Sequence, residues 1–293
     1  MIDVSIIIVN YNTCEVTKNC INSIFEYTKD IKFEVILVDN NSQDESKSLF
    51  SQDKRINYIY LTSNLGFGKA NNVGYEQAKG KYLFLLNSDT LLRSNAVKEF
   101  NDFMESSSPS IAFTGTMLKD IKNNIIHSYG NFPTLLTGFR WYSILGIILN
   151  KLGYIESQDL AVTDKQVDYI TGADLFIRKD VINKYGLFDP DFFMYFEETE
   201  LQYRYTHYGY KCYIYSTPKI IHLENYSMNK SYKNYLRKLS VSLPSYYLYL
   251  KKCKGTMIYY IFRIIYALVS LLWIIYPKCS LESKLNMIKK AYN

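Results

Sequence analysis

The stretch Tyr82-Leu83-Phe84-Leu85-Leu86-Asn87-Ser88-Asp89 decides the fold. Its five leading apolar or aromatic residues are typical of a strand that is buried on both faces of a parallel sheet. The run ends in an amide, a hydroxyl and a carboxylate, which are side chains that favour a turn. Ligands of open parallel sheets gather at the carboxyl ends of the strands. We therefore predict that residues 87–89 lie at the binding edge of such a sheet.

Two similar runs precede this stretch. Residues 4–9 and 33–38 are rich in β-branched side chains, and polar clusters follow them at Tyr11 and at Asp39. A shorter strand is predicted at residues 56–61. Helical spacing of apolar residues fills the intervals, and strands that alternate with helices predict a parallel sheet with right-handed crossovers. The three polar clusters are then expected to face one crevice.

Further elements are predicted downstream of the first strands. A helix is expected at residues 70–77, a strand at 172–178 and a second helix at 197–208, ended by Gly209. The apolar stretch 141–152 (WYSILGIILNKL) is too short to span a bilayer. It is interpreted either as a core helix or as a flap that faces a membrane.

The chain has 293 residues, of which 48% are hydrophobic. This length suits one large α/β domain with an appendage. We predict a first domain at residues 1–240, with a nucleotide-binding half at about 1–112 and an acceptor half at about 113–240. A basic, apolar and helical extension is predicted at residues 241–293.

Charge is distributed unevenly along the chain, whose net charge is +6. From Met228 onward there are twelve Lys and Arg residues and one acid, Glu282. A basic and apolar tail favours an anionic membrane surface as partner over nucleic acid, and no nucleic-acid-binding motif is found. The five cysteines are scattered without a CxxC pair, which indicates a reducing, cytoplasmic location.

The tail contains an apolar segment at residues 257–276, with Arg263 as its single charge. Its length would just span a bilayer, and its aromatic residues also suit a helix that lies in the interface. A core helix or an oligomer interface is the structural alternative. Lysines flank the segment on both sides, at Lys251, Lys252, Lys254 and Lys278. We expect contact with the inner face of the cell membrane.

A second acidic signature occupies residues 192–200 (FFMYFEETE), and His222 ends a later strand. Together with Asp89 these residues indicate a site for a metal ion and a base. Neighbouring helical residues point about 100° apart, so only one of Glu197 and Glu198 can aim into the crevice. Acids at the start of a helix are also favoured by the helix dipole. Glu200 is interpreted as a capping residue or, less favoured, as a residue that orients a partner.

Six motifs occur along the chain in the order that they have in a known protein family: VSIIIVNYN, VILVDNNSQD, NLGFGKANNVG, LLNSDT, GADLFIR and FFMYFEETEL. Over residues 4–227 the chain resembles glycosyltransferase family 2, and within it the bacterial rhamnosyltransferase-like branch. The resemblance implies the GT-A fold, a Rossmann-like and mostly parallel α/β sheet flanked by helices. Two departures are evident. Asn87 replaces the first acid of the Asp-x-Asp motif, and residues 223–227 (LENYS) replace a Gly/Ser-rich stretch.

The resemblance also implies roles for residues at matching positions. Glu198 is the expected general base, Asp89 and His222 are the expected metal ligands, and Glu197, Glu200 and Ser227 are supporting candidates. A nucleotide sugar of the dTDP or UDP type is expected to contact a larger set, namely Asn10, Tyr11, Asp39, Gly66, Phe67, Gly68, Asn71 and Ser88.

The chemistry of sugar transfer fits these residue types. Charge builds on the diphosphate as the glycosidic bond breaks, and a divalent cation stabilises it as a Lewis acid. Oxygen ligands suit Mg²⁺, and a histidine shifts the preference toward Mn²⁺. We predict an inverting, metal-dependent glycosyltransferase that acts on a lipid-linked or growing cell-surface polysaccharide, with rhamnose among the candidate sugars and a homo-oligomer as a candidate assembly. The alternative is a catalytically silent sugar-nucleotide or glycan-binding subunit; a sugar-nucleotide pyrophosphorylase ranks last.

Overall fold

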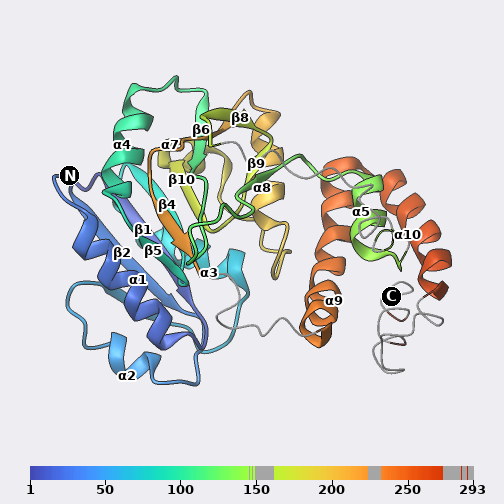
Figure 1. Cartoon of the computed structure of the whole chain (residues 1–293), viewed down its shortest axis with the longest axis horizontal. Helices are drawn as coiled ribbons and strands as arrows, with labels where there is room; N and C mark the ends of the chain where they lie inside the picture. Colours follow the sequence, from blue (N-terminus) through green and yellow to red (C-terminus); the bar gives the residue numbers. More distant parts are fainter. Residues whose placement is uncertain are drawn as a thin grey trace.

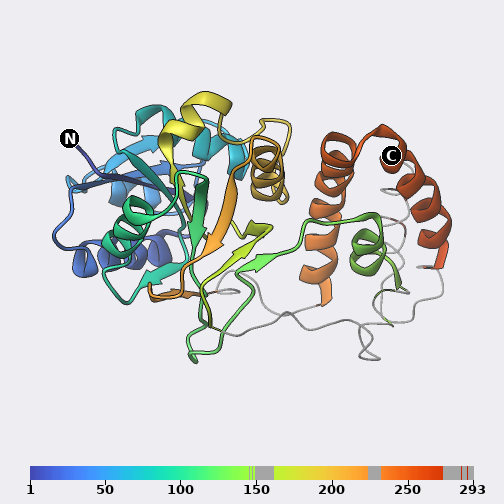
Figure 2. The same ribbon diagram turned by 90° about the horizontal axis from the view of Figure 1, so that it is seen from above.

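The structure is a computed structural model that describes residues 1–144, 146, 148, 162–223, 232–272, 285 and 289. An α/β body built on one large sheet carries the N-terminal part of the chain (Figure 1). A group of helices formed by α5, α9 and α10 stands beside this body, and the view from above shows the same arrangement (Figure 2).

The large sheet has eight strands in the order β3-β2-β1-β4-β10-β6-β11-β8. β1 lies parallel to β2 and β4, β2 is parallel to β3, and β6 is parallel to β11. β10 runs antiparallel to both of its neighbours, β4 and β6. The predicted, mostly parallel sheet is therefore confirmed, whereas the sequence pattern did not indicate the antiparallel pairing of β10 with its neighbours or of β8 with β11. The bounds are β1 Val4–Asn10, β2 Phe33–Asp39, β3 Asn57–Tyr60, β4 Tyr82–Asn87, β6 Ile111–Gly115, β8 Lys165–Val167, β10 Asp174–Arg178 and β11 Lys211–Ile214.

The central strands are buried on both faces, which explains why their sequences are continuously apolar. In β1, Ile7 packs into one core, whereas Ile6 and Ile8 pack into the opposite core. Residues of α3, α7 and α8 contribute to the first core, and residues of α1 and α4 contribute to the second. The helices are α1 Cys14–Tyr27, α2 Ser46–Phe50, α3 Phe67–Gln77, α4 Ala96–Ser106, α7 Lys179–Tyr185 and α8 Glu197–Thr206.

Two small antiparallel sheets connect distant parts of the body. β5 (Thr90–Leu92) pairs with β12 (Ile220–His222), and β7 (Tyr129–Gly130) pairs with β9 (Tyr169–Ile170). The first of these pairs carries residues of the candidate site.

A third hydrophobic core lies among the C-terminal helices. It contains residues of α5 (Leu135–Tyr142), of α9 (Tyr232–Tyr249), of the π-helical segment η1 (Leu250–Lys254) and of α10 (Thr256–Ser270). Two residues of the α/β body, Phe192 and Phe196, belong to the same core. The described residues 241–272 of the extension are largely helical, and the boundary placed at residue 240 falls inside α9. Positions 273–284, 286–288 and 290–293, which include Lys278 and the end of the apolar segment 257–276, lie outside the described residues.

The apolar stretch at residues 141–152 is described only in part. Tyr142 and Ile144 are buried in the third core, which agrees with the core-helix interpretation for these positions. Trp141 and Ile148 of the same stretch are 41% and 45% exposed, so its described part has both buried and exposed positions. Positions 145, 147 and 149–152 lie outside the described residues.

Helix α10 has two different faces. Phe262, Tyr266 and Ser270 are fully buried. The opposite face exposes a stripe of apolar side chains, which we call the α10 stripe: Met257, Tyr260, Ile261, Ile264, Ile265, Leu268, Leu271 and Leu272. Among the described residues, no helix combines the length and the hydropathy needed to cross a membrane.

We predict that Phe262→Ala lowers the free energy of unfolding by about 3–5 kcal/mol, because a fully buried phenylalanine is replaced by a cavity. Its ring packs against Phe139 and Tyr246 at centroid distances of 4.8 and 5.1 Å. Ile264→Ala is the matched control on the same helix, since Ile264 is 64% exposed, and its effect is expected within about 0.5 kcal/mol. Urea unfolding of the full chain measures both. Equal stability of the two variants would show that α10 does not pack on α5 and α9 in solution.

Candidate active site

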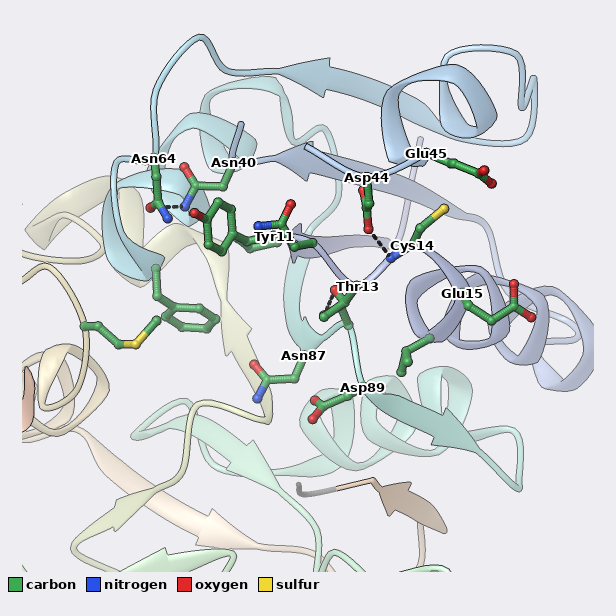
Figure 3. Close-up of a pocket in the computed structure, with 16 residues that line it drawn as sticks. Tyr11, Thr13, Cys14, Glu15, Asn40, Asp44, Glu45, Asn64, Asn87 and Asp89 are labelled. Atoms are coloured by element: carbon green, nitrogen blue, oxygen red, sulfur yellow. Dashed lines mark hydrogen bonds between the residues drawn. The ribbon is translucent and has the colours of Figure 1, made fainter. Parts of the chain in front are cut away.

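A pocket of about 640 Å³ opens at the carboxyl ends of β1, β2 and β4, as expected for an open α/β sheet. We call it the nucleotide pocket (Figure 3). Four predicted residues line it: Tyr11, Phe67, Ser88 and Asp89. The Tyr11 ring is 48% exposed, which leaves it accessible for stacking on a planar ligand. Other wall residues were not predicted as ligand contacts, namely Thr13, Asn40, Asp44 and Asn64.

Asn10 is fully buried and does not line this pocket. Its amide nitrogen donates to the hydroxyls of Ser42 and Ser46, at 3.1 and 2.8 Å. Its oxygen accepts from Thr13 and Thr17, at 2.8 and 2.9 Å. An asparagine amide has two donor and two acceptor positions, and all four are used. Asn10 therefore joins the loops after β1 and β2 from below the pocket.

Asp39 is likewise fully buried below the pocket. One carboxylate oxygen accepts from the Ser42 backbone N–H, and the other accepts from the Tyr58 hydroxyl, both at 2.8 Å. Burial and the neighbouring Asp39 carboxylate raise the pKa of Tyr58. The adjacent Asn40 faces the pocket. The sequence offered a signal for it, because Asn40 directly follows the strand end.

The loop before α3 is held by Asn40. The Asn40 amide donates to Asn64 Oδ1 at 2.9 Å and accepts from the Leu65 N–H at 2.8 Å. Gly66 has φ +84°, and a Cβ there would lie 2.1 Å from the Phe193 carbonyl oxygen, so only glycine fits. The Phe67 N–H donates to the same carbonyl at 2.9 Å. This contact joins the predicted nucleotide loop to the acidic segment before α8.

Gly68 and Asn71 support this loop from inside. A Cβ on Gly68 would lie 3.2 Å from Phe188 Cβ, so the helix packs closely there. The buried Asn71 amide donates to the Phe67 carbonyl at 3.0 Å. Neither Gly66, Gly68 nor Asn71 lines the pocket wall.

The pairing of β5 with β12 brings His222 beside Asp89, although 133 positions separate them. His222 Nε2 lies 3.1 Å from Asp89 Oδ1, and the Leu223 N–H donates to the Asp89 carbonyl at 2.8 Å. His222 Nδ1 is buried and has no hydrogen-bond partner among the described residues. The two predicted metal ligands are thus adjacent.

The donor set of this pair suits a divalent cation. A carboxylate oxygen and an imidazole nitrogen face each other; the oxygen suits Mg²⁺ or Mn²⁺, and the imidazole shifts the preference toward Mn²⁺. Within the described part of the chain, no group of three or more His, Cys, Asp or Glu side chains converges. A cation held by Asp89 and His222 would therefore take its remaining ligands from the diphosphate and from water.

A second pocket of about 470 Å³ lies next to the first and shares three wall residues with it, Phe67, Asn87 and Met194. We call it the acceptor pocket. It brings together side chains from distant parts of the sequence, including Tyr169, Tyr195, Glu197, Glu198, His222 and Lys238. Lys238 belongs to α9 and was not predicted as a site residue.

The two adjacent glutamates have different surroundings. Glu197 is buried, and its Oε2 has no partner among the described residues. Burial and the charge of Glu198 raise the pKa of Glu197 well above its ordinary value. Glu198 is half-buried beside Gly172, whose missing Cβ would lie 3.7 Å from Glu198 Cβ. Burial raises the pKa of Glu198, while backbone N–H groups and Lys238 oppose that shift. Both glutamates line the acceptor pocket, and Glu198 is the more exposed of the two.

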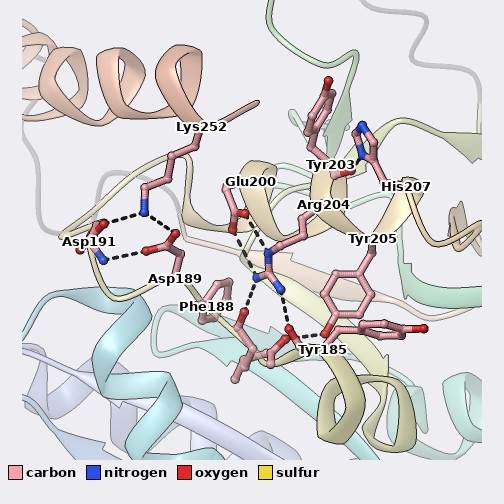
Figure 4. Close-up of polar contacts among 12 residues, drawn as sticks. Tyr185, Phe188, Asp189, Asp191, Glu200, Tyr203, Arg204, Tyr205, His207 and Lys252 are labelled. Atoms are coloured by element: carbon pink, nitrogen blue, oxygen red, sulfur yellow. Dashed lines mark hydrogen bonds and ion pairs between the residues drawn. The ribbon is translucent and has the colours of Figure 1, made fainter. Parts of the chain in front are cut away.

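Glu200 does not cap α8, so the capping interpretation is wrong. Its carboxylate is bound by Arg204, with Nε to Oε1 at 2.8 Å and Nη2 to Oε2 at 3.3 Å (Figure 4). Arg204 also donates to the Tyr185 and Leu187 carbonyls, at 2.8 and 2.6 Å. The pair therefore ties α8 to the end of α7. Ser227, the remaining candidate, lies outside the described residues.

Comparison with known proteins agrees with this geometry. The profile of glycosyl transferase family 2 matches residues 5–186. The low-salt glycan biosynthesis hexosyltransferase Agl10 of Haloferax volcanii is 29% identical over 211 residues, which are 69% of this chain and 61% of that protein. The chain spans roughly half the length of the curated relatives it matches.

Two solved structures share the fold. GalNAc-T7 with UDP, GalNAc and Mn²⁺ has a TM-score of 0.58 at 15% identity, over 86% of this chain and 51% of that one. The structure of residues 1–349 of TarS from S. aureus in complex with UDP has a TM-score of 0.54 at 15% identity. The match covers 99% of this chain and 81% of that one. The GT-A arrangement expected from the sequence is confirmed. The family profile covers more than half of the chain, and the chain belongs to glycosyltransferase family 2.

Proposed function

We propose that the protein transfers a sugar from a nucleoside diphosphate to a hydroxyl of a glycan acceptor, with inversion at the anomeric carbon. The observation that carries this proposal is the meeting of two pockets at Phe67, Asn87 and Met194. Asp89 lines one pocket and Glu198 lines the other. A donor and an acceptor bound in these pockets would be in contact at the shared wall, which is what direct displacement requires.

The reaction is a single displacement. The acceptor oxygen forms a bond to the anomeric carbon, and the bond from that carbon to the diphosphate oxygen breaks. Glu198 takes the proton of the attacking hydroxyl, and the nucleoside diphosphate leaves with the electron pair. Burial and the charge of Glu198 raise the pKa of Glu197, which favours its protonated form and makes it the weaker candidate for this role.

The nucleotide pocket supports a donor of the dTDP or UDP type, and titration with a panel of nucleotide sugars, rhamnose among them, tests which sugar the donor carries. Tyr11 offers an exposed ring for the base, and Asn40, Asn64 and Ser88 offer hydrogen-bonding groups on the wall. Asn10 and Asp39 act from below by holding the loops that carry these groups. Gly66, Gly68 and Asn71 act in the same way on the loop that carries Phe67.

A divalent cation, Mn²⁺ or Mg²⁺, would be held by Asp89 and His222. Bound there, it would stabilise the negative charge of the departing diphosphate. The adjacency of the two side chains supports this assignment, as does the solved structure of GalNAc-T7 with UDP, GalNAc and Mn²⁺. Asn87 lines both pockets beside this pair and is free of charge, so it would not compete with Asp89 for the cation.

The acceptor is proposed to be a lipid-linked or growing cell-surface glycan. Similarity to a hexosyltransferase of glycan biosynthesis supports a saccharide acceptor. Aromatic rings line the acceptor pocket at Phe67, Tyr169 and Tyr195, and such rings suit the apolar faces of sugars.

The α10 stripe is proposed to lie in the interface of an anionic membrane, at its inner face, where a lipid-linked acceptor would be. Its residues recur every three or four positions on one side of a helix whose other side is packed, which suits in-plane binding. The lysines that precede the stripe contribute less to membrane binding than the sequence indicates. Lys252 is engaged by Asp189 and Asp191, and Lys254 lies over the Tyr203 ring at 4.2 Å. Lys251 remains exposed.

Glu198→Gln is expected to lower kcat by roughly 10²-fold or more while donor affinity is retained, because the base is lost and the side-chain shape is kept. Glu197→Gln is the matched control and is expected to keep its activity, because burial favours the protonated form of this carboxyl and glutamine keeps its shape. Steady-state kinetics and calorimetry with a panel of nucleotide sugars measure both. The opposite result, an inactive Glu197→Gln and an active Glu198→Gln, would move the base by one residue.

The activity of the wild-type enzyme is expected to fall toward acidic pH as Glu198 takes up a proton. Because burial raises the pKa of Glu198, the loss begins at a higher pH than for an ordinary glutamate. Glu198→Gln should remove this limb from the residual rate. If the residual rate of Glu198→Gln falls at acidic pH as the wild-type rate does, the titrating group is a residue other than Glu198.

Asp89→Ala is expected to lower kcat by about 100-fold or more, since Lewis-acid stabilisation amounts to several kcal/mol. EDTA should abolish wild-type activity, and Mn²⁺ or Mg²⁺ should restore it. The variant should lose its response to added metal. Full activity in EDTA would remove the metal from the proposal and leave Asp89 and His222 as a hydrogen-bonded pair.

Liposome flotation tests the membrane proposal. The full chain is expected to float with anionic vesicles at low salt, and Leu268→Glu, in the α10 stripe, should abolish flotation. Ile121→Glu is the matched control, because Ile121 is an equally exposed apolar residue on the α/β body, at 73% against 65%. If the wild type stays in solution and sedimentation shows that Leu268→Glu dissociates an oligomer, the stripe is an interface between copies of the chain.

A further inference from the structure

The segment that leads into α8 has an uncommon backbone. Tyr195 and Phe196 have φ angles of +70° and +67°. Side chains other than glycine rarely adopt this left-handed region, and two large aromatic residues in succession need strong external support. Phe196 occupies the N-cap position of α8 and makes no side-chain capping bond. The direction in which α8 begins therefore depends on what holds residues 194–196.

One face of α9 supplies that support. The Ser245 hydroxyl donates to the Met194 carbonyl at 2.7 Å. The rings of Tyr246 and Tyr249 pack on Phe196 at centroid distances of 5.3 and 5.8 Å. Lys238 Nζ lies 5.8 Å from the centroid of the Tyr195 ring. The helix positions 238, 245, 246 and 249 recur at helical spacing, so one face of α9 contacts three consecutive residues of the segment.

The same segment is held at two further points. Lys252 of η1 binds the carboxylates of Asp189 and Asp191, each at 2.6 Å (Figure 4). On the opposite side, the Phe67 N–H donates to the Phe193 carbonyl at 2.9 Å. The carbonyls of two successive residues, 193 and 194, are thus bound by the nucleotide loop and by α9.

We propose that α9 is a positioning element of the active site and that Ser245 is its central residue. By binding the Met194 carbonyl, Ser245 holds the left-handed turn at Tyr195 and Phe196, and this turn aims Glu198 into the acceptor pocket. The catalytic part of this inference rests on the proposed function, whereas the structural part does not. The C-terminal helices are then a component of the catalytic machinery and do not serve only as an anchor.

Ser242 provides a matched control. It lies on the same helix and is 7% exposed, as Ser245 is. Its hydroxyl lies 3.1 Å from the Tyr142 hydroxyl, so its bond stays among the C-terminal helices and does not reach the turn. Ser242→Ala and Ser245→Ala therefore remove the same group from the same helix, and only the second removes a contact with residues 194–196.

Hydrogen–deuterium exchange of the full chain, with no ligand added, tests the structural part. In Ser245→Ala, peptides covering residues 192–200 are expected to exchange about five- to tenfold faster, the factor for one hydrogen bond of ordinary net strength. In Ser242→Ala these peptides should exchange as in the wild type. Equal exchange in the two variants would overturn the proposal. If Ser245→Ala unfolds as a whole, Ser245→Cys keeps the volume with a weaker donor, and wild-type exchange in that variant would overturn it equally.

Kinetics tests the catalytic part once a donor and an acceptor are in hand. Ser245→Ala should lower kcat about five- to tenfold with the KM for the donor unchanged, because the base is misplaced and the nucleotide pocket is intact. Ser245→Thr, which keeps the hydroxyl, should recover most of kcat. A change in exchange without a change in kcat would confine Ser245 to a structural role. A wild type that transfers no sugar would refute the proposed function and leave the exchange result standing.

Discussion

The turn at residues 193–196 is the constraint on which the site depends. A left-handed conformation costs roughly 1–2 kcal/mol for each residue other than glycine, and Tyr195 and Phe196 both adopt it. Aromatic contacts worth about 0.5–1.5 kcal/mol each and a hydrogen bond of about 1 kcal/mol offset that cost. These contacts come from α9 and from the loop before α3. The base, the nucleotide loop and the C-terminal helices are therefore parts of one packed unit.

The nucleotide pocket is built on buried amides. The Asn10 amide makes four hydrogen bonds, all with residues of the loops and helices that follow β1 and β2. Asn40 holds the loop that contains Asn64 and Gly66. A buried amide that is fully bonded is rigid, because any movement leaves a polar group unsatisfied. Asn10 and Asp39, which are expected at the ligand from the sequence, hold the loops behind the wall, while Tyr11 and Asn40 line the pocket.

The C-terminal helices combine two properties that the sequence presents as one. Their aromatic residues form a core with α5 and with Phe192 and Phe196 of the α/β body. Their remaining apolar residues form the exposed α10 stripe. The hydropathy of the segment does not reveal this division. Phe262 and Ile264 are both large and apolar, but they lie on different faces of the helix, one buried and one exposed. The division explains how one segment can support the site and still present an apolar surface.

The sequence by itself determined the α/β class, the central strands and the polar residues at their ends, because continuous apolar runs followed by turn residues admit few other structures. It also placed Asp89, His222 and Glu198 correctly at element ends. Only the tertiary structure decided that β10 runs antiparallel, that Glu200 pairs with Arg204 and that α9 belongs to both the body and the extension. The direction of β10 and the position of α9 depend on contacts between residues far apart in the chain, whereas Glu200 and Arg204 are four positions apart on one helix. The meeting of His222 with Asp89 across 133 positions, and the hold of Ser245 on Met194, are set by packing that local patterns do not encode.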